Sequence, residues 1–277
     1  MSQNNEENNT KATDFSNTVI ADKDFSNKNL TGAIFSGCTL RNVIFDNAML
    51  DGAHFQNASL ESCRFGRTHL NMADFAGAQI ISSYFSMCDL RYGNFTCAKM
   101  DRGFMRSSDL SDSIWWGSSV NDSFFVGSKM LKVSFEAATG SRNMFCFANM
   151  KNANFCNARM NYSNFARARM VGAKMSWATL RHSFMREAIL TGSILAFANL
   201  SNSALDGANL SRARLKGVNL SNTGLKKTNF SDANLTGAVL IGSSLEDANL
   251  KGAVLEDIIF SATRDDPEES QVMPQIA

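Results

Sequence analysis

The sequence contains very little proline and histidine and carries no excess of charge of either sign. Its 277 residues include two prolines, both in the last eleven positions, and three histidines. The formal net charge is +1, which argues against nucleic-acid binding and against a strongly acidic surface. No apolar run approaches the ~20 residues of a membrane-spanning helix, and the N-terminus lacks a basic segment followed by an apolar one. We therefore expect a soluble cytoplasmic protein without a transmembrane segment, with secretion that needs no classical signal peptide as the open alternative.

Residues that commonly perform chemistry are sparse as well. The histidines are far apart, none is placed with a Ser or Cys nucleophile and a carboxylate, and there is no glycine-rich phosphate loop. The six cysteines form neither a CxxC pair nor a Cys/His group with metal-ligand spacing. We predict that the protein is not an enzyme, has no small-molecule substrate, binds no cofactor or metal and keeps its cysteines as reduced thiols.

A five-residue repeat runs through nearly the whole chain without an insertion or deletion. Every fifth residue from Phe15 to Phe260 is Leu, Phe, Met, Ile, Val or Trp in forty-nine of fifty cases, and Gly140 is the exception. Two positions before these central residues the side chain is small in forty-six of fifty cases. The departures from this rule are Lys23, Lys28, Asn143 and Ile258. The other three positions of each unit are mostly polar, so two positions in five are predicted to face a core.

A period of five fits neither the 3.6 residues of a helical turn nor the alternation of a strand. It fits a coil in which each unit forms one side of a square and directs its central and small residues to the axis. Four units then complete a lap of twenty residues, and successive laps pair ~4.8 Å apart. Residues twenty apart are indeed alike, as in the file Phe15, Phe35, Phe55, Phe75 and Phe95. We predict an all-β solenoid of about twelve such coils.

A methionine-rich stretch separates a phenylalanine-rich N-terminal part from a leucine-rich part that begins at Leu190. Its central residues include Met100, Met105, Met130, Met150, Met160, Met170, Met175 and Met185. Flexible thioether side chains suit a zone where layers filled by rings meet layers filled by leucine. A methionine-lined ligand or metal pocket is the alternative.

Several units show a tandem A(D/N)LXX pattern. Examples are 48–52 AMLDG, 153–157 ANFCN, 208–212 ANLSR, 233–237 ANLTG and 248–252 ANLKG. The pattern resembles that of the pentapeptide-repeat protein family over residues from about 13 to 262. The resemblance implies a right-handed quadrilateral parallel β-helix, often dimeric through a C-terminal cap. It also implies an interaction protein, since some members protect or inhibit DNA gyrase by imitating DNA and others are delivered into host cells.

The extent of the repeat predicts three segments. They are a disordered N-terminal tail over 1–12, the β-solenoid over 13–262 and a short C-terminal capping segment over 263–277. In the last segment Asp266 and Pro267 suit the start of a short helix. Such a helix would lay Val272, Met273 and Ile276 over the last turn, next to Phe260. Capping of this end and homodimer formation through it are alternatives.

One outward file of the coil is unusually apolar. Tyr84, Phe104, Phe124 and Met144 follow one another at steps of twenty, one position before a central residue, where side chains are expected to face solvent. Trp116 lies near them in the sequence, and Arg102, Arg106 and Arg142 are expected to form a basic rim. Exposed rings bordered by arginine favour a protein-binding patch. The alternative is that the rings lie flat along the rod and shield the backbone ladders.

Charged residues at steps of twenty alternate in sign. Examples are Arg102, Asp122, Arg142 and Asp206, Lys226, Glu246. This alternation predicts ladders of ion pairs instead of one acidic face. A second group of basic residues could attract an anionic partner such as nucleic acid or lipid head groups. It falls on different sides of the coil, which favours a solvated basic band and disfavours a nucleic-acid partner; its members are Arg159, Arg167, Arg169, Lys174, Arg181 and Arg186.

These patterns together favour a non-catalytic scaffold that binds a protein partner through an exposed side of the solenoid. Modulation of DNA gyrase or another type II topoisomerase, with a quinolone-protection-like activity, is the alternative function. A secreted bacterial effector is the second alternative.

Overall fold

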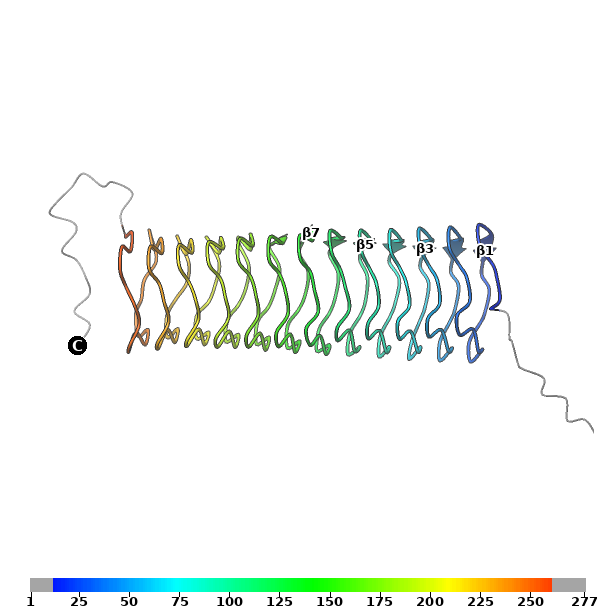
Figure 1. The fold of residues 1–277 in the computed structure, drawn as a ribbon, viewed down its shortest axis with the longest axis horizontal. Coiled ribbons are helices and arrows are strands. Elements are labelled where there is room, and N and C mark those ends of the chain that lie inside the picture. Colours follow the sequence, from blue (N-terminus) through cyan, green and yellow to red (C-terminus); the bar gives the residue numbers. More distant parts are fainter. Residues whose placement is uncertain (1–11, 261–277) are drawn as a thin grey trace, which may run out of the picture.

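Pairing between residues twenty apart organises the chain. The computed structural model describes residues 12–260, in which eight short strands form one parallel sheet in sequence order. The strands are β1 (Val19–Ala21), β2 (Thr39–Arg41), β3 (Ser59–Glu61), β4 (Gln79–Ile81), β5 (Lys99–Asp101), β6 (Ser119–Asn121), β7 (Thr139–Ser141) and β8 (Arg159–Asn161). Ile20 of β1, for example, pairs with Leu40 of β2. Figure 1 shows the laps following one another along one axis as a rod, which confirms the predicted all-β parallel solenoid.

The coil has four sides, because three further files of parallel bridges with the same offset accompany the sheet. We call them the first, second, third and fourth side, after their first central residues Phe15, Ile20, Phe25 and Leu30. Strands β1 to β8 lie on the second side. Each outward residue can therefore be placed on one side or at one corner of the rod.

Extended strands cover fewer laps than the twelve that we predicted. The eight strands give seven consecutive pairings, from β1–β2 to β7–β8, and so about seven laps. Beyond β8 the coil continues at the same offset through isolated bridges, the last of which joins Val239 to Ile259. Only one residue of each five-residue unit pairs there, so these laps contain bridges and no strands.

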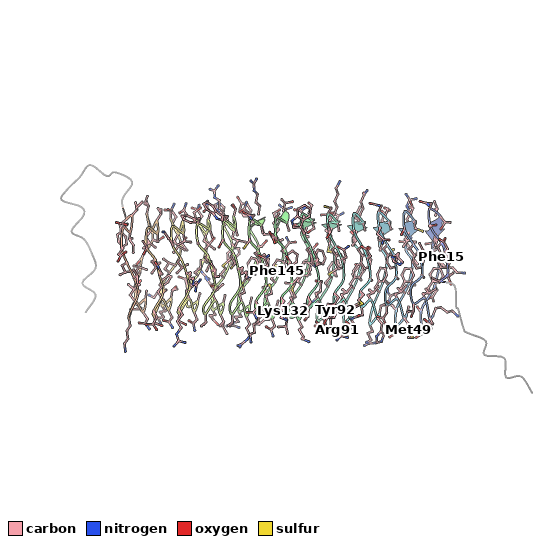
Figure 2. All side chains as sticks on the ribbon, viewed as in Figure 1. Phe15, Met49, Arg91, Tyr92, Lys132 and Phe145 are labelled. Atoms are coloured by element: carbon pink, nitrogen blue, oxygen red, sulfur yellow. The ribbon has the colours of Figure 1, made fainter. Side chains whose placement is uncertain are left out.

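The predicted files of core residues are present. Phe35 and Phe55 stack with ring centroids 4.9 Å apart, and Phe35 meets Phe45 of the third side edge to face at 5.5 Å. Both arrangements are favourable for aromatic rings. The central methionines are fully buried among these layers, which supports their role in packing. In Figure 2, Phe145 lies inside the rod, whereas Arg91, Tyr92 and Lys132 lie along one edge.

Most units turn their corner in the same way. The carbonyl of a central residue accepts a hydrogen bond from the N–H three positions later, as from Ala33 to Leu30 at 2.9 Å, and the residue two positions after the centre has a positive φ. This is the geometry of a type II turn. Asn, Asp and Gly tolerate it best, which explains why they recur at this position.

The small position holds a buried polar file where the second side meets the third. Ser83 and Asn143 donate to the carbonyls of Leu60 and Val120, which lie twenty-three residues earlier, at 3.4 and 2.7 Å. The members of this file include Cys63, Ser83, Ser123, Asn143, Ser163, Ser183, Ser203, Thr223 and Ser243. Most of these side chains have a hydrogen-bond partner despite their burial, as buried polar groups require.

The predicted C-terminal cap and the predicted homodimer both depend on the ends of the chain. Residues 1–11 and 261–277 lie outside the described part, and with them most of the predicted tail and the cap residues Val272, Met273 and Ile276. Phe260 is 40% exposed on the last described lap. The C-terminal cap and the homodimer therefore stay predictions.

Candidate functional site: an outward file of stacked rings

The rings of Tyr84, Phe104 and Phe124 stack along the third side. Their centroids are 4.7 and 4.9 Å apart and their planes are inclined by 7° and 0°. The backbone bridges from Tyr84 to Phe104, Phe124 and Met144 set this spacing, because neighbouring laps lie one strand distance apart. The predicted alignment of the four side chains is confirmed.

Other apolar side chains widen this file into a surface. Met87 and Phe147 are 56% and 58% exposed at the corner between the third and fourth sides, and Val126 follows Phe125 on the third side. We call these residues, together with Tyr84, Phe104, Phe124 and Met144, the ring face. Tyr84 is 45% exposed, whereas Phe104, Phe124 and Met144 are half-buried. The stacked rings thus cover part of the backbone and also present their edges to solvent.

Trp116 does not belong to the ring face. It follows Trp115, which stacks on Phe95 and Phe135 in the core file of the first side. Trp115 meets Phe125, ten residues later, edge to face across the axis at 5.8 Å. Ten residues are half a lap, so Trp116 points away on the opposite side of the rod. Its nearness to the file in the sequence was misleading.

The predicted arginine rim lies beside the rings. Arg142 forms two hydrogen bonds with Asp122, at 2.6 and 2.7 Å, at the corner between the second and third sides. The hydrogen bond from Arg142 lowers the pKa of the Asp122 carboxyl. Arg102 pairs with Asp101 at 3.0 Å, whereas Arg106 has no ion pair with any residue of 12–260. One of the three arginines is therefore available to a partner without breaking an existing pair.

A hollow of about 320 Å³ lies at the N-terminal end of the ring face. Gly66, which has no side chain, leaves space beside the ion pair of Arg64 and Asp46. In this pair the nitrogen and oxygen atoms are 2.5 Å apart. Its lining consists of Asp46, Asn47, Arg64, Gly66, Arg67, Tyr84, Ser86 and Met87. Tyr84 and Met87 belong to both the hollow and the ring face, so the two form one continuous surface.

Sequence reasoning missed Met87 of this surface and Phe184 beyond its end. Met87 was hidden because corner positions were taken to be polar. Phe184, which is 52% exposed, continues the file of Tyr84 two laps beyond Met144. Asn164 interrupts the file, but extending the reading at steps of twenty would have found Phe184.

The charge ladders have the predicted form except at Arg102, which pairs with Asp101 and not with Asp122. Lys226 pairs with Glu246 at 2.5 Å and Arg186 with Asp206 at 3.2 Å, each across one lap. The basic residues from Arg159 to Arg186 are distributed over all four sides, as expected. Between residues 12 and 260, no group of His, Cys, Asp and Glu is arranged to hold a metal ion. In the same range, no helix is long and apolar enough to span a bilayer.

Several solved structures resemble the chain. HetL, a pentapeptide repeat protein involved in heterocyst differentiation regulation from the cyanobacterium Nostoc, is 23% identical over 90% of this chain and 93% of its own, with a TM-score of 0.32. QnrB1, a plasmid-mediated fluoroquinolone resistance protein, is 17% identical over 88% and 92%, with a TM-score of 0.25. A pentapeptide repeat protein of the Arabidopsis thaliana thylakoid lumen is 29% identical over 36% and 66%, with a TM-score of 0.29. At these TM-scores none of them supports an argument about function.

A search of curated proteins finds no match. The family model described as pentapeptide repeats, by contrast, matches eight times along the chain. The matched residues are 11–47, 29–67, 58–96, 148–186, 168–203, 185–222, 193–232 and 228–263. Since these matches cover well over half of the chain, on both halves of the rod, the protein belongs to the pentapeptide repeat family.

Proposed function

We propose that the protein is a non-catalytic cytoplasmic scaffold that binds a protein partner through the ring face. The observation that supports this most directly is the file of outward rings, Tyr84, Phe104 and Phe124, stacked at 4.7 and 4.9 Å. Outward positions of a solenoid need no apolar side chain for folding, and exposed aromatic clusters are typical of protein interfaces. Arg106 at the rim adds a charge that a partner carboxylate can pair with.

The double substitution Phe104→Ser and Phe124→Ser tests this proposal. Removing two half-buried rings should cost about 1–3 kcal/mol of stability, so the rod should keep its circular dichroism spectrum. Affinity capture followed by mass spectrometry should recover a protein with the wild type and lose it with this variant. Binding of the identified protein, measured by calorimetry, should weaken at least about tenfold.

The variant Met72→Ser/Tyr92→Ser is the matched control. Both residues are exposed, at 64% and 52%, and they share a different corner of the rod, where Figure 2 shows Tyr92. The control should capture the same protein as the wild type. Undiminished capture by Phe104→Ser/Phe124→Ser would show that the ring face is not the binding site.

Gyrase modulation has less support from the surface. A DNA mimic needs one acidic face, whereas Asp122, Glu187 and Asp206 each pair with an arginine on a neighbouring lap. A gyrase supercoiling assay with and without a quinolone decides this alternative. If the protein protected gyrase from the quinolone at stoichiometric concentrations, gyrase modulation would replace the scaffold role as the proposed function.

A further inference from the structure

Two pairs of stacked rings border the second side of the coil. Trp177 and Phe197 stack at 4.4 Å at the corner between the first and second sides. Tyr162 and His182 stack at 4.8 Å, with planes inclined by 5°, at the corner between the second and third sides. Trp177 and His182 are five residues apart on one lap, so the two pairs face each other across the width of a single side.

Folding does not account for these four rings. Trp177, Phe197, Tyr162 and His182 have φ values of 61°, 59°, 59° and 57°, which cost an L-residue other than glycine roughly 1–2 kcal/mol. The other laps place Asn, Gly, Cys, Ala or Asp at the corner of Trp177 and Phe197. Trp177 is 61% exposed and Tyr162 is 53% exposed, so burial offsets little of this cost.

Between the two ring pairs the surface offers hydrogen-bond donors. Arg159 and Arg181 are exposed and have no ion pair with any residue in 12–260, whereas Arg142, Arg167 and Arg186 nearby are all paired. The Oδ1 atoms of Asn161 and Asn199 accept from the backbone N–H groups of Arg181 and Ser201. Their Nδ2 groups have no partner among the described residues and remain available as donors.

The second side lacks negative charge over the same laps. Its units 138–142, 158–162, 178–182, 198–202 and 218–222 contain no Asp or Glu. We call the surface formed by Arg159, Arg181, Asn161, Asn199 and the two ring pairs the donor face. No carboxylate on this side can accept hydrogen bonds from its two guanidinium groups and two amide groups. An anionic ligand would therefore suit these donors.

We propose that the donor face binds an acidic segment of a protein, separately from the ring face. The rings favour a carboxylate-bearing chain over single-stranded nucleic acid, because bases stack on ring faces. Within each pair the inner ring faces cover each other, and Phe197 also lies over Gly217, where an added Cβ would be 2.6 Å from its Cδ1 atom. Five of the eight ring faces are thus covered, and the exposed ring edges are electropositive and suit carboxylate oxygens.

The test uses the full chain and a fluorescein-labelled peptide of alternating glutamate and alanine. At about twelve residues it spans about 40 Å when extended. Fluorescence anisotropy at low salt should show binding, and the same peptide with glutamine in place of glutamate should not bind. The variant Arg159→Gln/Arg181→Gln should bind the acidic peptide at least about tenfold more weakly.

Arg169→Gln/Lys174→Gln is the matched control. It removes the same charge from the same part of the rod, and both side chains are exposed, without ion pairs among the described residues, on the fourth and first sides. It should bind the peptide as the wild type does. An equal loss in both variants, equal binding of the glutamine peptide or no binding by the wild type would overturn the proposal. Tighter binding of an oligothymidylate with the same number of charges would assign the donor face to nucleic acid instead.

Discussion

Individual residues at the small position do more than fill space. Cys63 and Cys88 are buried and donate through Sγ to the carbonyls of Leu40 and Phe65, at 3.5 and 2.6 Å. Burial raises the pKa of Cys63 to about 11 and that of Cys88 to about 12, from 9.0. The thiols stay protonated in the folded state, in which they donate to these carbonyls; the Phe65 carbonyl also accepts from the N–H of Thr68 at 3.1 Å.

Stability should therefore fall in alkali. The unfolded thiols lose their protons near pH 9 and the folded thiols do so only at about 11 and 12. Between these values the unfolded state binds fewer protons, so the free energy of unfolding decreases as pH rises, by up to about 1.4 kcal/mol per pH unit for each thiol. Urea unfolding from pH 7 upward measures this slope.

Cys63→Ala/Cys88→Ala supplies the control for the alkaline slope. Alanine occupies the same position at Ala48 and Ala78, where it is fully buried, so the variant should fold. Its stability should fall less steeply above pH 9 than that of the wild type, because its other titratable groups are unchanged. Parallel curves for the two proteins would contradict the assignment.

Among the elements, the contact between β6 and β7 is irregular at Gly140. Its φ is +153°, and an added Cβ would lie 1.7 Å from the carbonyl oxygen of Val120. The same oxygen accepts a hydrogen bond of 2.7 Å from Nδ2 of Asn143, which is fully buried. Gly140 and Asn143, both exceptions to the repeat, thus belong to one local arrangement. Glycine is required because the Val120 carbonyl occupies the space of a side chain.

Gly140→Ala should destabilise the rod strongly. The strained φ alone costs of order 1–3 kcal/mol, and relief of the clash requires the ladder between β6 and β7 to shift. We expect a loss of at least about 3 kcal/mol and a thermal midpoint lower by about 6 °C or more, measured by circular dichroism. Gly127→Ala is the comparison, because Gly127 has φ +67° and nothing within 4 Å of an added Cβ. It should cost only about 1–2 kcal/mol, and an equal effect of both changes would disprove the role of the Val120 carbonyl.

The whole molecule is a stack in which each lap contacts the laps before and after it, at an offset of twenty residues. Such a rod has no single centre that depends on all of its parts. Its length should therefore be adjustable by whole laps, provided that every side remains aligned with the same side of the next lap.

Deletion of residues 41–60 tests this directly. It removes one lap and joins Leu40 to Glu61, so that Phe35 should stack on Phe75 in place of Phe55. The shortened protein should fold, with a thermal midpoint lower by only a few degrees. Deletion of 41–57 leaves Leu60 three residues after Leu40, and both side chains cannot then face the axis. That variant should fail to unfold cooperatively, and equal stability of the two deletions would refute the twenty-residue lap.

Much of the fold could be predicted from the repeat. The period of five separates inward from outward residues, and the similarity of residues twenty apart aligns the laps, so the files of Phe35 and Leu40 and the ring file from Tyr84 to Met144 were anticipated. The candidate site was predicted less completely. Trp116 was grouped with the rings by nearness in sequence although it lies half a lap away, and Met87 escaped notice because corner positions are mostly polar.

The sequence by itself determined which side chains face the axis, which share a file and how long one lap is, because each of these depends only on the position of a residue within the repeat. The tertiary structure alone decided where the tips of side chains and the carbonyl groups lie. Arg102 pairs with Asp101 and not with Asp122, the Val120 carbonyl excludes a side chain at Gly140, and Arg159 and Arg181 remain unpaired between two ring pairs. A repeat fixes the direction of each Cβ, whereas these contacts depend on rotamers, on peptide orientation and on how neighbouring laps meet at a corner.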